Sequence, residues 1–437
     1  MQDRRRVFIS FLGTSNYNSC TYEIGGNTPF TYESRYIQEV LLRNHAKQGW
    51  SSTDKAYILL TEVAREKNWL NDGHRTKDGD LVKQAGLRDC LAGASLPMSV
   101  EDIPVPPGNT SEEIMDIFSR VFSLINDGDE LYFDITHGFR YLPMVTIVLG
   151  NYSKLLRGAK VAWIGYGNFE GRDFATNVAQ VVDITSLSVL QDWTLAAADF
   201  TNNGNVEALT TLTTKEVQPI LLESKGSNQT AKALRCMAKS LSEMVGDMKT
   251  CRGKEVLKSE KAGNLQCALA SIEENMIPPL TPIIEKIKVS VSDFKEGYEI
   301  SNGFAAAKWC MNYDMIQQAA TILQETVISW IYIRNNLEGK KLEETREIVT
   351  KAIKCSELDQ TEWVVKDETQ RGEIKRVIEN EVLLRNKAFK EIYTNLSELR
   401  NDINHCGMRN NPTSASKIKR NLERCYSKLK EIFEENF

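Results

Sequence analysis

The strongest constraint on the fold is a regular alternation, over the first 185 residues, of short β-rich apolar runs with longer amphipathic stretches. The runs have the length and composition of strands, and the stretches have helical spacing. Such alternation is typical of a parallel sheet with helices on both faces. We therefore expect strands at 7–12, 56–61, 103–105, 131–135, 161–166 and 178–184, and helices near 32–47, 111–126 and 139–156.

The pattern changes near residue 190, where the β signal fades and Leu, Ile, Glu, Lys and Ala recur at helical spacing. Three prolines at 278, 279 and 282 interrupt the helical pattern. A length of 437 residues also suits more than one separate core. The sequence predicts a Rossmann-like α/β domain over 1–188, a helical connector over 189–300 and an all-α domain over 301–437.

Composition excludes several classes of protein. With 41% hydrophobic and 26% charged residues the chain has the make-up of a soluble globular protein, and no run approaches the roughly 18 apolar residues that span a bilayer. The apolar run 7–12 follows three arginines but is too short for a signal peptide. We expect a cytoplasmic protein that does not contact membranes. A net charge of -5 argues against coating nucleic acid and confines any such contact to a local site.

Metal and redox cofactors are not expected. The nine cysteines form no CxxC pair and no Cys/His cluster, which favours reduced thiols and no metal site. Neither GxGxxG nor GxxxxGK[ST] occurs, which argues against a dinucleotide cofactor and a P-loop. The sequence therefore predicts a protein without a cofactor.

Two loops form a candidate ligand site, because parallel sheets bind ligands where loops leave the carboxyl ends of their strands. Backbone N–H groups and short side-chain donors in such loops suit a phosphate or a nucleotide edge. The candidate residues are Gly13, Thr14, Ser15, Asn16 and Tyr17 after the first strand, and Thr136, His137, Gly138, Phe139 and Arg140 after the strand at 131–135.

Structural roles for these loop residues stay open. Thr136 can cap a helix, His137 can be a satisfied loop histidine, and Arg140 can pair on the surface. The segment 106–110 is either a third wall of the pocket or simply a turn with a helix N-cap.

A candidate catalytic stretch ends a helical stripe near residue 400. His405 lies one helical turn after Asn401, Arg400 is rotated aside, and Gly407 is expected to end the helix. For attack of a ribose 2′-hydroxyl on a phosphate, His405 would transfer protons, Arg400 would stabilise the phosphorane and Asn401 would orient one of them. The alternative is a surface arginine with a histidine that interacts with the helix dipole.

The segment Asp134-Ile135-Thr136-His137-Gly138 resembles the DxTHG signature of CRISPR-associated proteins with a CARF domain, and 11–14 with Tyr17 resembles the first strand of that group. In that family the CARF domain is a Rossmann-like dimer that binds cyclic oligoadenylate made by a type III effector complex. The resemblance implies that Thr14, Ser15, Thr136, His137, Gly138 and Arg140 contact this activator. Cyclic tetra-adenylate is the first candidate, and cyclic hexa-adenylate is the second.

The stretch Arg400 to His405 resembles the R(x)4-6H motif of HEPN ribonucleases, so the two resemblances together cover about 1–185 and 300–437. They imply a metal-independent endoribonuclease that cuts single-stranded RNA at a composite site of a homodimer, or of a higher homo-oligomer of dimers. Two alternatives remain: a non-catalytic nucleotide-responsive regulator, and a ring nuclease that opens the cyclic oligoadenylate at Thr14 and His137.

Overall fold

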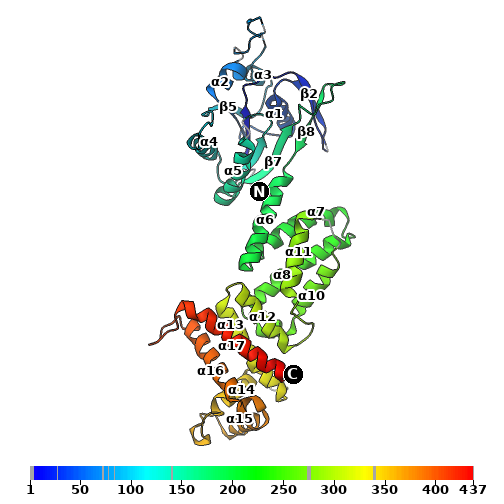
Figure 1. Ribbon diagram of the computed structural model, residues 1–437. Coiled ribbons are helices and arrows are strands. Elements are labelled where there is room, and N and C mark those ends of the chain that lie inside the picture. The colour runs from blue at the N-terminus through cyan, green and yellow to red at the C-terminus, as the bar shows by residue number, and fades with distance from the viewer. Residues whose placement is uncertain are drawn as a thin grey trace. The chain divides into compact units, whose positions relative to one another are not determined.

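The chain forms two compact units, Met1–Asp192 and Trp193–Phe437. The computed structural model describes residues 4–26, 28–70, 73–76, 78–82, 84–138, 141–272, 277–337 and 341–436. The first unit is α/β and the second is helical throughout its described residues, as Figure 1 shows, which confirms the predicted fold classes. The division of the helical half into a connector and a domain at residue 300 stays a prediction.

One sheet of eight strands, in the order β3-β2-β8-β7-β6-β1-β4-β5, organises the first unit. Its strands are β1 (Arg6–Leu12), β2 (Cys20–Ile24), β3 (Phe30–Ser34), β4 (Lys55–Leu60), β5 (Ser99–Pro104), β6 (Glu130–Asp134), β7 (Lys160–Gly167) and β8 (Val178–Asp183). The pairs that join β5, β4, β1, β6 and β7 are parallel, but β8 is antiparallel to β7 and β3 to β2. The sheet is thus mixed, and the expectation of a parallel sheet was wrong at this edge.

The sequence prediction missed the β2–β3 hairpin and the short helices between β4 and β5. Residues 30–34 are a strand, so the helix predicted over 32–47 begins only at Ile37. The residues of β3 are β-formers that pair with β2, and this cross-strand pairing outweighs a helical spacing that extended too far upstream. Gly25 and Gly26 precede β3, and Gly26 has a φ of 108°, so this dipeptide was the available hairpin signal.

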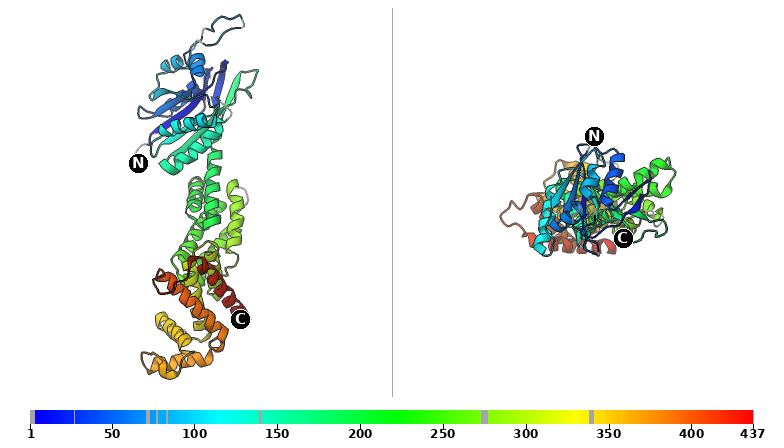
Figure 2. Two further views of the ribbon diagram at one scale, coloured as in Figure 1. Left: turned by 60° about the vertical axis from the view of Figure 1, so that its left-hand side comes forward. Right: turned by 90° about the horizontal axis from the view of Figure 1, so that it is seen from above.

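Helices cover both faces of the sheet because the side chains of β1 alternate between two cores. Val7, Ile9 and Phe11 pack with residues of α4 (Ser111–Ser123) and α5 (Leu142–Arg157), whereas Phe8 and Leu12 pack on the opposite side. The core on that opposite side is completed by α1 (Ile37–Lys47), the π-helix η1 (Arg65–Trp69) and α3 (Leu87–Ala92), and Figure 2 shows the sheet between the helices. The short α2 (Glu62–Ala64) precedes η1.

The helical unit is built around α13. After α6 (Ser186–Asn203), its helices are α7 (Glu207–Glu223), α8 (Gln229–Lys249), α9 (Gly253–Lys258), α10 (Glu260–Ala270), η2 (Pro278–Leu280), α11 (Thr281–Val291), α12 (Ile300–Asn312), α13 (Ile316–Arg334), α14 (Leu342–Cys355), η3 (Gln360–Glu362), α15 (Glu368–Asn380), η4 (Val382–Arg385), α16 (Lys387–Asn404) and α17 (Ala415–Glu435). Trp330 of α13 is fully buried and meets Phe389 of α16 and Phe433 of α17 edge to face. This packing fixes the position of α16. None of the described helices has the length and apolarity needed to cross a membrane.

Candidate functional site

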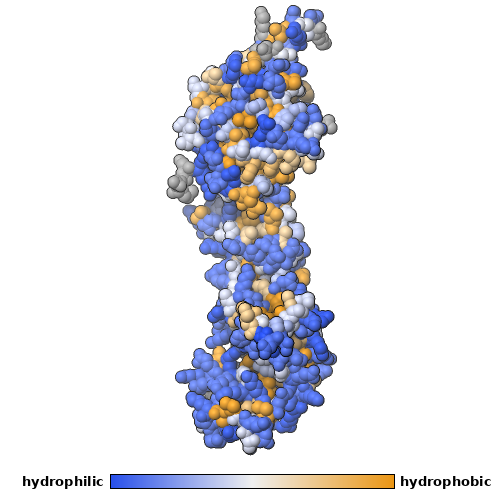
Figure 3. Space-filling model, turned by 90° about the vertical axis from the view of Figure 1, so that its left-hand side faces the viewer, coloured by the Kyte–Doolittle hydropathy of each residue, from blue (hydrophilic) through white to orange (hydrophobic). Residues whose placement is uncertain are grey.

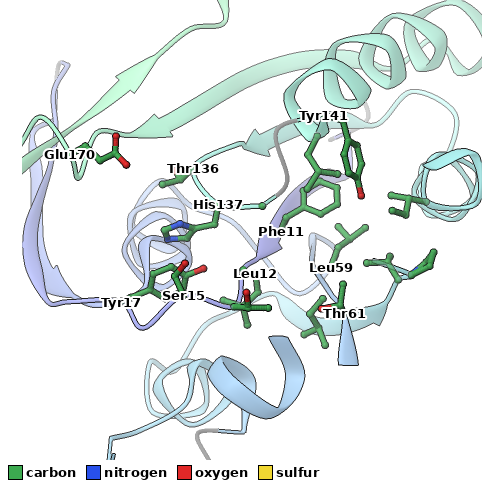
Figure 4. A pocket seen from close by; sticks show the side chains of 18 residues that line it. Phe11, Leu12, Ser15, Tyr17, Leu59, Thr61, Thr136, His137, Tyr141 and Glu170 are labelled. Atoms are coloured by element: carbon green, nitrogen blue, oxygen red, sulfur yellow. The ribbon is translucent and has the colours of Figure 1, made fainter. Parts of the chain in front are cut away.

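A cavity of about 400 Å³ opens at the carboxyl ends of β1, β4 and β6. The neighbours of β1 are β4 on one side and β6 on the other, so the strand order reverses here, and ligands bind at such switch points in α/β sheets. A second cavity of about 290 Å³ adjoins it. Ser15, Tyr17, Thr136, His137 and Glu170 line both cavities, and Figure 4 shows these residues around the first.

A buried carboxylate shapes the turn after β6. Asp134 is 1% exposed and accepts hydrogen bonds from the Thr136 backbone N–H (3.0 Å), the Thr136 hydroxyl (2.5 Å) and Ser10 Oγ (2.7 Å). Burial raises the pKa of Asp134, although these hydrogen bonds favour its charged form. Thr136 Oγ1 also accepts a hydrogen bond from the Gly167 N–H at 2.8 Å. The hydroxyl of Thr136 therefore ties β6 to β7, and both its hydroxyl and its N–H make hydrogen bonds inside the fold.

Two glycines leave room for the mouth of the site. Gly138 has a φ of 122°, and a Cβ there would lie 2.4 Å from Leu142 Cδ1. A Cβ at Gly13 would lie 2.5 Å from the Tyr17 hydroxyl. The backbone conformation at 138 favours glycine, and a side chain at 13 would displace the Tyr17 ring from its position.

The rings of Tyr17 and His137 stack between the two cavities, with centroids 4.1 Å apart and an interplanar angle of 23°. His137 as a residue is half-buried, but its Nε2 is enclosed and makes no hydrogen bond within the described part of the chain. Burial lowers the pKa of His137 to about 4, so the ring is uncharged at neutral pH and adds no positive charge for an anion. Burial also raises the pKa of Tyr17.

Asn68 holds the first loop in place, a role that the sequence did not reveal. It is fully buried in the π-helix η1, and its Nδ2 donates to the carbonyl oxygens of Gly13 (2.8 Å) and Ser15 (2.9 Å). Its Oδ1 lies 3.0 Å from His74 Nε2. Single-turn π-helices occur often at functional sites, but an asparagine distant in sequence carries no signal of this contact.

Arg35 is the second residue that sequence reasoning missed. Its Nε donates to the Tyr17 carbonyl oxygen (3.2 Å) and its Nη2 to Asn16 Oδ1 (3.1 Å), while Nη1 is enclosed without a partner among the described residues. It is the one Lys or Arg among the described residues that line either cavity, and Glu170 is the one carboxylate. Only the end of the unpredicted β3 brings Arg35 here.

The structure brings most of the predicted loop residues together. The first cavity is lined by Gly13, Thr14, Ser15, Tyr17, Thr136, His137 and Gly138, and the second adds Asn16. Phe139 and Arg140 lie outside the described residues. Both interpretations of 106–110 hold, because Pro106 lines the cavity and Thr110 caps α4 by accepting from the Glu113 N–H at 3.2 Å.

The second candidate site lies at the C-terminal end of α16. Arg400 is half-buried, with its Nε donating to Gln324 Oε1 of α13 at 2.7 Å and its Nη1 to Asn401 Oδ1 at 3.1 Å. His405 is exposed and caps the helix, and Gly407, with a φ of 66°, follows as predicted. Arg400 and His405 make no hydrogen bond to each other within the described residues. The guanidinium is thus held on the Asn401 side of the helix while the imidazole stays open to solvent.

One comparison matches the first unit, and another extends into the helical unit. Residues 7–162 match the family model of the CARF domain of the CRISPR system endoribonuclease Csx1. The CRISPR-associated protein MJ1674 of Methanocaldococcus jannaschii is 25% identical over 345 residues, which cover 71% of this chain and 51% of that protein. The chain therefore spans about half the length of this curated relative. Both loops of the cavity lie within the family match, and Arg400 to His405 lie beyond it.

Proposed function

We propose that this chain is an ancillary endoribonuclease of type III CRISPR defence, because its residues 7–162 match the CARF domain of a CRISPR system endoribonuclease and the chain is similar to a CRISPR-associated protein. A cyclic oligoadenylate binds the CARF domain and activates the helical unit to cut single-stranded RNA. The observation that carries the proposal is the presence in one chain of two sites: a switch-point cavity with a phosphate-compatible rim, and a half-buried Arg400 near the exposed Asn401 and His405.

The chemistry of the cavities suits an oligoadenylate. Residues 13–15 of the first loop line the first cavity, and the aromatic residues Tyr17 and Tyr141 line it for contact with adenine. Arg35 offers a guanidinium to a phosphate in the second cavity, and Glu170 is an acceptor for a ribose hydroxyl or an adenine amino group. Cyclic tetra-adenylate is the first ring size to test, and cyclic hexa-adenylate is the second.

The residues on α16 suit attack by a ribose 2′-hydroxyl on the adjacent phosphate. Arg400, held by Gln324 and Asn401, presents a fixed positive charge for the phosphorane. His405 is accessible and moves the proton of the attacking hydroxyl or of the leaving oxygen. The nucleophile belongs to the substrate, and the proposed reaction uses Arg400 and His405 in place of a metal ion.

A dimer through the first unit agrees with an exposed apolar face on α5. Met144, Val148, Tyr152 and Leu155 recur at helical spacing and are 71%, 57%, 42% and 81% exposed. Exposed apolar patches of this kind mark protein interfaces, and Figure 3 shows hydrophobic side chains at the surface of this unit. Because the turn after β6 leads into α5, a second copy on this face would approach the mouth of the cavity.

An RNase assay against a panel of cyclic oligoadenylates tests the function. His405→Ala should lower activated RNA cleavage by about 10² to 10⁴ and leave activator binding unchanged. Lys354→Ala, an exposed basic residue in the last turn of α14, is the matched control and should cut normally. If the wild-type protein does not cut RNA with a cyclic oligoadenylate of any ring size, the chain is a regulator rather than a nuclease. Chromatography of the activator from the same tubes reports ring opening.

A further inference from the structure

A third cavity, of about 270 Å³, lies between α16 and α17. The two helices pack through Leu399 of α16 and the buried Leu422 and Cys425 of α17. The rim of the cavity is polar, with side chains from both helices and from the segment that joins them. The polar lining residues are Asn395, Glu398, Arg409, Asn411, Thr413, Asn421 and Arg424.

The two arginines at this cavity are exposed and have no partner among the described residues. Within the described chain, Arg409 and Arg424 make no ion pair and no side-chain hydrogen bond, whereas nearby Lys419 pairs with Asp314 at 2.6 Å. The side-chain amides of the lining asparagines also lack partners among the described residues. A hollow ringed by free donors and acceptors can bind a ligand without first breaking protein contacts.

The charge around the cavity is positive in a chain whose net charge is -5. Two arginines face one carboxylate, that of Glu398. Lys417, Arg420 and Lys428 are exposed on α17 at spacings of three, four or seven residues from Arg424 or from each other, so they extend the basic surface along one side of the helix. Such a stripe is the electrostatic footprint of a nucleic-acid contact.

The cavity adjoins the proposed catalytic residues. Leu399, which lines it, directly precedes Arg400, and Arg409 follows His405 by one short segment. That segment is fastened to α16, because the Thr413 N–H donates to Asp402 Oδ2 at 2.7 Å. The cavity and the proposed catalytic residues therefore share the C-terminal part of α16 and the segment that follows it.

We propose that the α16–α17 cavity holds a nucleotide of the single-stranded RNA substrate, with Arg409 and Arg424 on its phosphates and the asparagine amides on its base. This inference rests on the RNA-cleaving function proposed above and adds residues that position the substrate. Guanidinium groups suit phosphates, and amides pair with the edges of bases that single-stranded RNA leaves open.

Salt-dependent RNA binding tests the proposal without relying on cleavage. The anisotropy of a labelled single-stranded RNA is measured with full-length His405→Ala protein, with and without cyclic tetra-adenylate, between about 50 and 200 mM salt. Adding Arg409→Gln and Arg424→Gln should reduce the slope of log K against log salt by about 1.4, since each phosphate contact on a single strand contributes about 0.7. Lys232→Gln with Arg235→Gln, which removes the same charge from exposed positions on α8, should leave the slope unchanged.

The proposal is overturned if the variant changed at Arg409 and Arg424 and the variant changed at Lys232 and Arg235 bind RNA with the same affinity and the same salt dependence. It is also overturned if the His405→Ala protein does not bind RNA. Failure of the catalytic function has a different signature. In that case wild-type protein leaves RNA intact with every activator, while the slope still falls when Arg409 and Arg424 are replaced.

Discussion

The hydroxyl of Thr136 offers a sharp test, because a ligand-binding role and a structural role predict opposite results for Thr136→Val. The structure gives this hydroxyl two bonds inside the fold, to Asp134 and from the Gly167 N–H. Valine keeps the shape but loses a bond to a carboxylate, worth about 1.5–3 kcal/mol, and leaves an N–H unsatisfied at about 1–3 kcal/mol. Asp134 retains its bonds from the Thr136 N–H and Ser10, which limits the total loss to about 3 kcal/mol.

For a unit of this size, about 3 kcal/mol lowers the melting temperature by roughly 6–12 °C. Differential scanning calorimetry of the full chain measures this shift, and Thr136→Ser, which keeps the hydroxyl, should melt within a few degrees of wild type. The reasoning is refuted if Thr136→Val melts like wild type yet no longer binds the cyclic oligoadenylate. That result would show that the Thr136 hydroxyl binds the ligand and does not stabilise the fold.

Three further predictions concern other parts of the chain. Gly138→Ala should lower the free energy of unfolding, measured with denaturant, by about 2 kcal/mol, because alanine is strained at a φ of 122° and its Cβ meets Leu142. An unchanged free energy of unfolding would mean that the turn relaxes without strain. Burial lowers the pKa of His45 to about 4, so the folded state takes up fewer protons than the unfolded state, and wild type should lose stability as pH falls from 6.5 towards 4. His45→Gln should lose less melting temperature than wild type when the pH is lowered from 7 to 4.5. An equal loss in the two proteins would contradict this prediction. Gln324→Leu frees Arg400 and should lower kcat of activated RNA cleavage by about tenfold with little effect on KM, and an unchanged kcat would show that Gln324 does not position Arg400.

The sequence predicted what depends on local pattern. The buried runs of β1, β4, β6 and β7 were placed within one or two residues because such strands are continuously apolar. The hairpin was missed because β2 and β3 alternate polar and apolar residues and form no apolar run, and β5 began earlier than expected, at Ser99, because its first residues are mostly polar.

The site shows the same division. Motifs located the two loops, but the inward direction of the Thr136 hydroxyl depends on Gly167, which lies on another strand. Asn68 and Arg35 reach the first loop only through tertiary packing, so no spacing in the sequence indicates them. At α16 the sequence placed the helix end correctly, whereas the bond from Arg400 to Gln324 joins helices that are far apart along the chain.

The stacked rings of Tyr17 and His137 act as a partition with a selective consequence. A molecule long enough to occupy both compartments must arch over the pair or separate it, and separation costs about 0.5–1.5 kcal/mol. A mononucleotide that fits in one compartment avoids the cost of separating the rings, but it contacts only the residues that line that compartment. If the proposed activator binds here, a larger ring would offset this cost by filling both compartments, whereas a mononucleotide would occupy one.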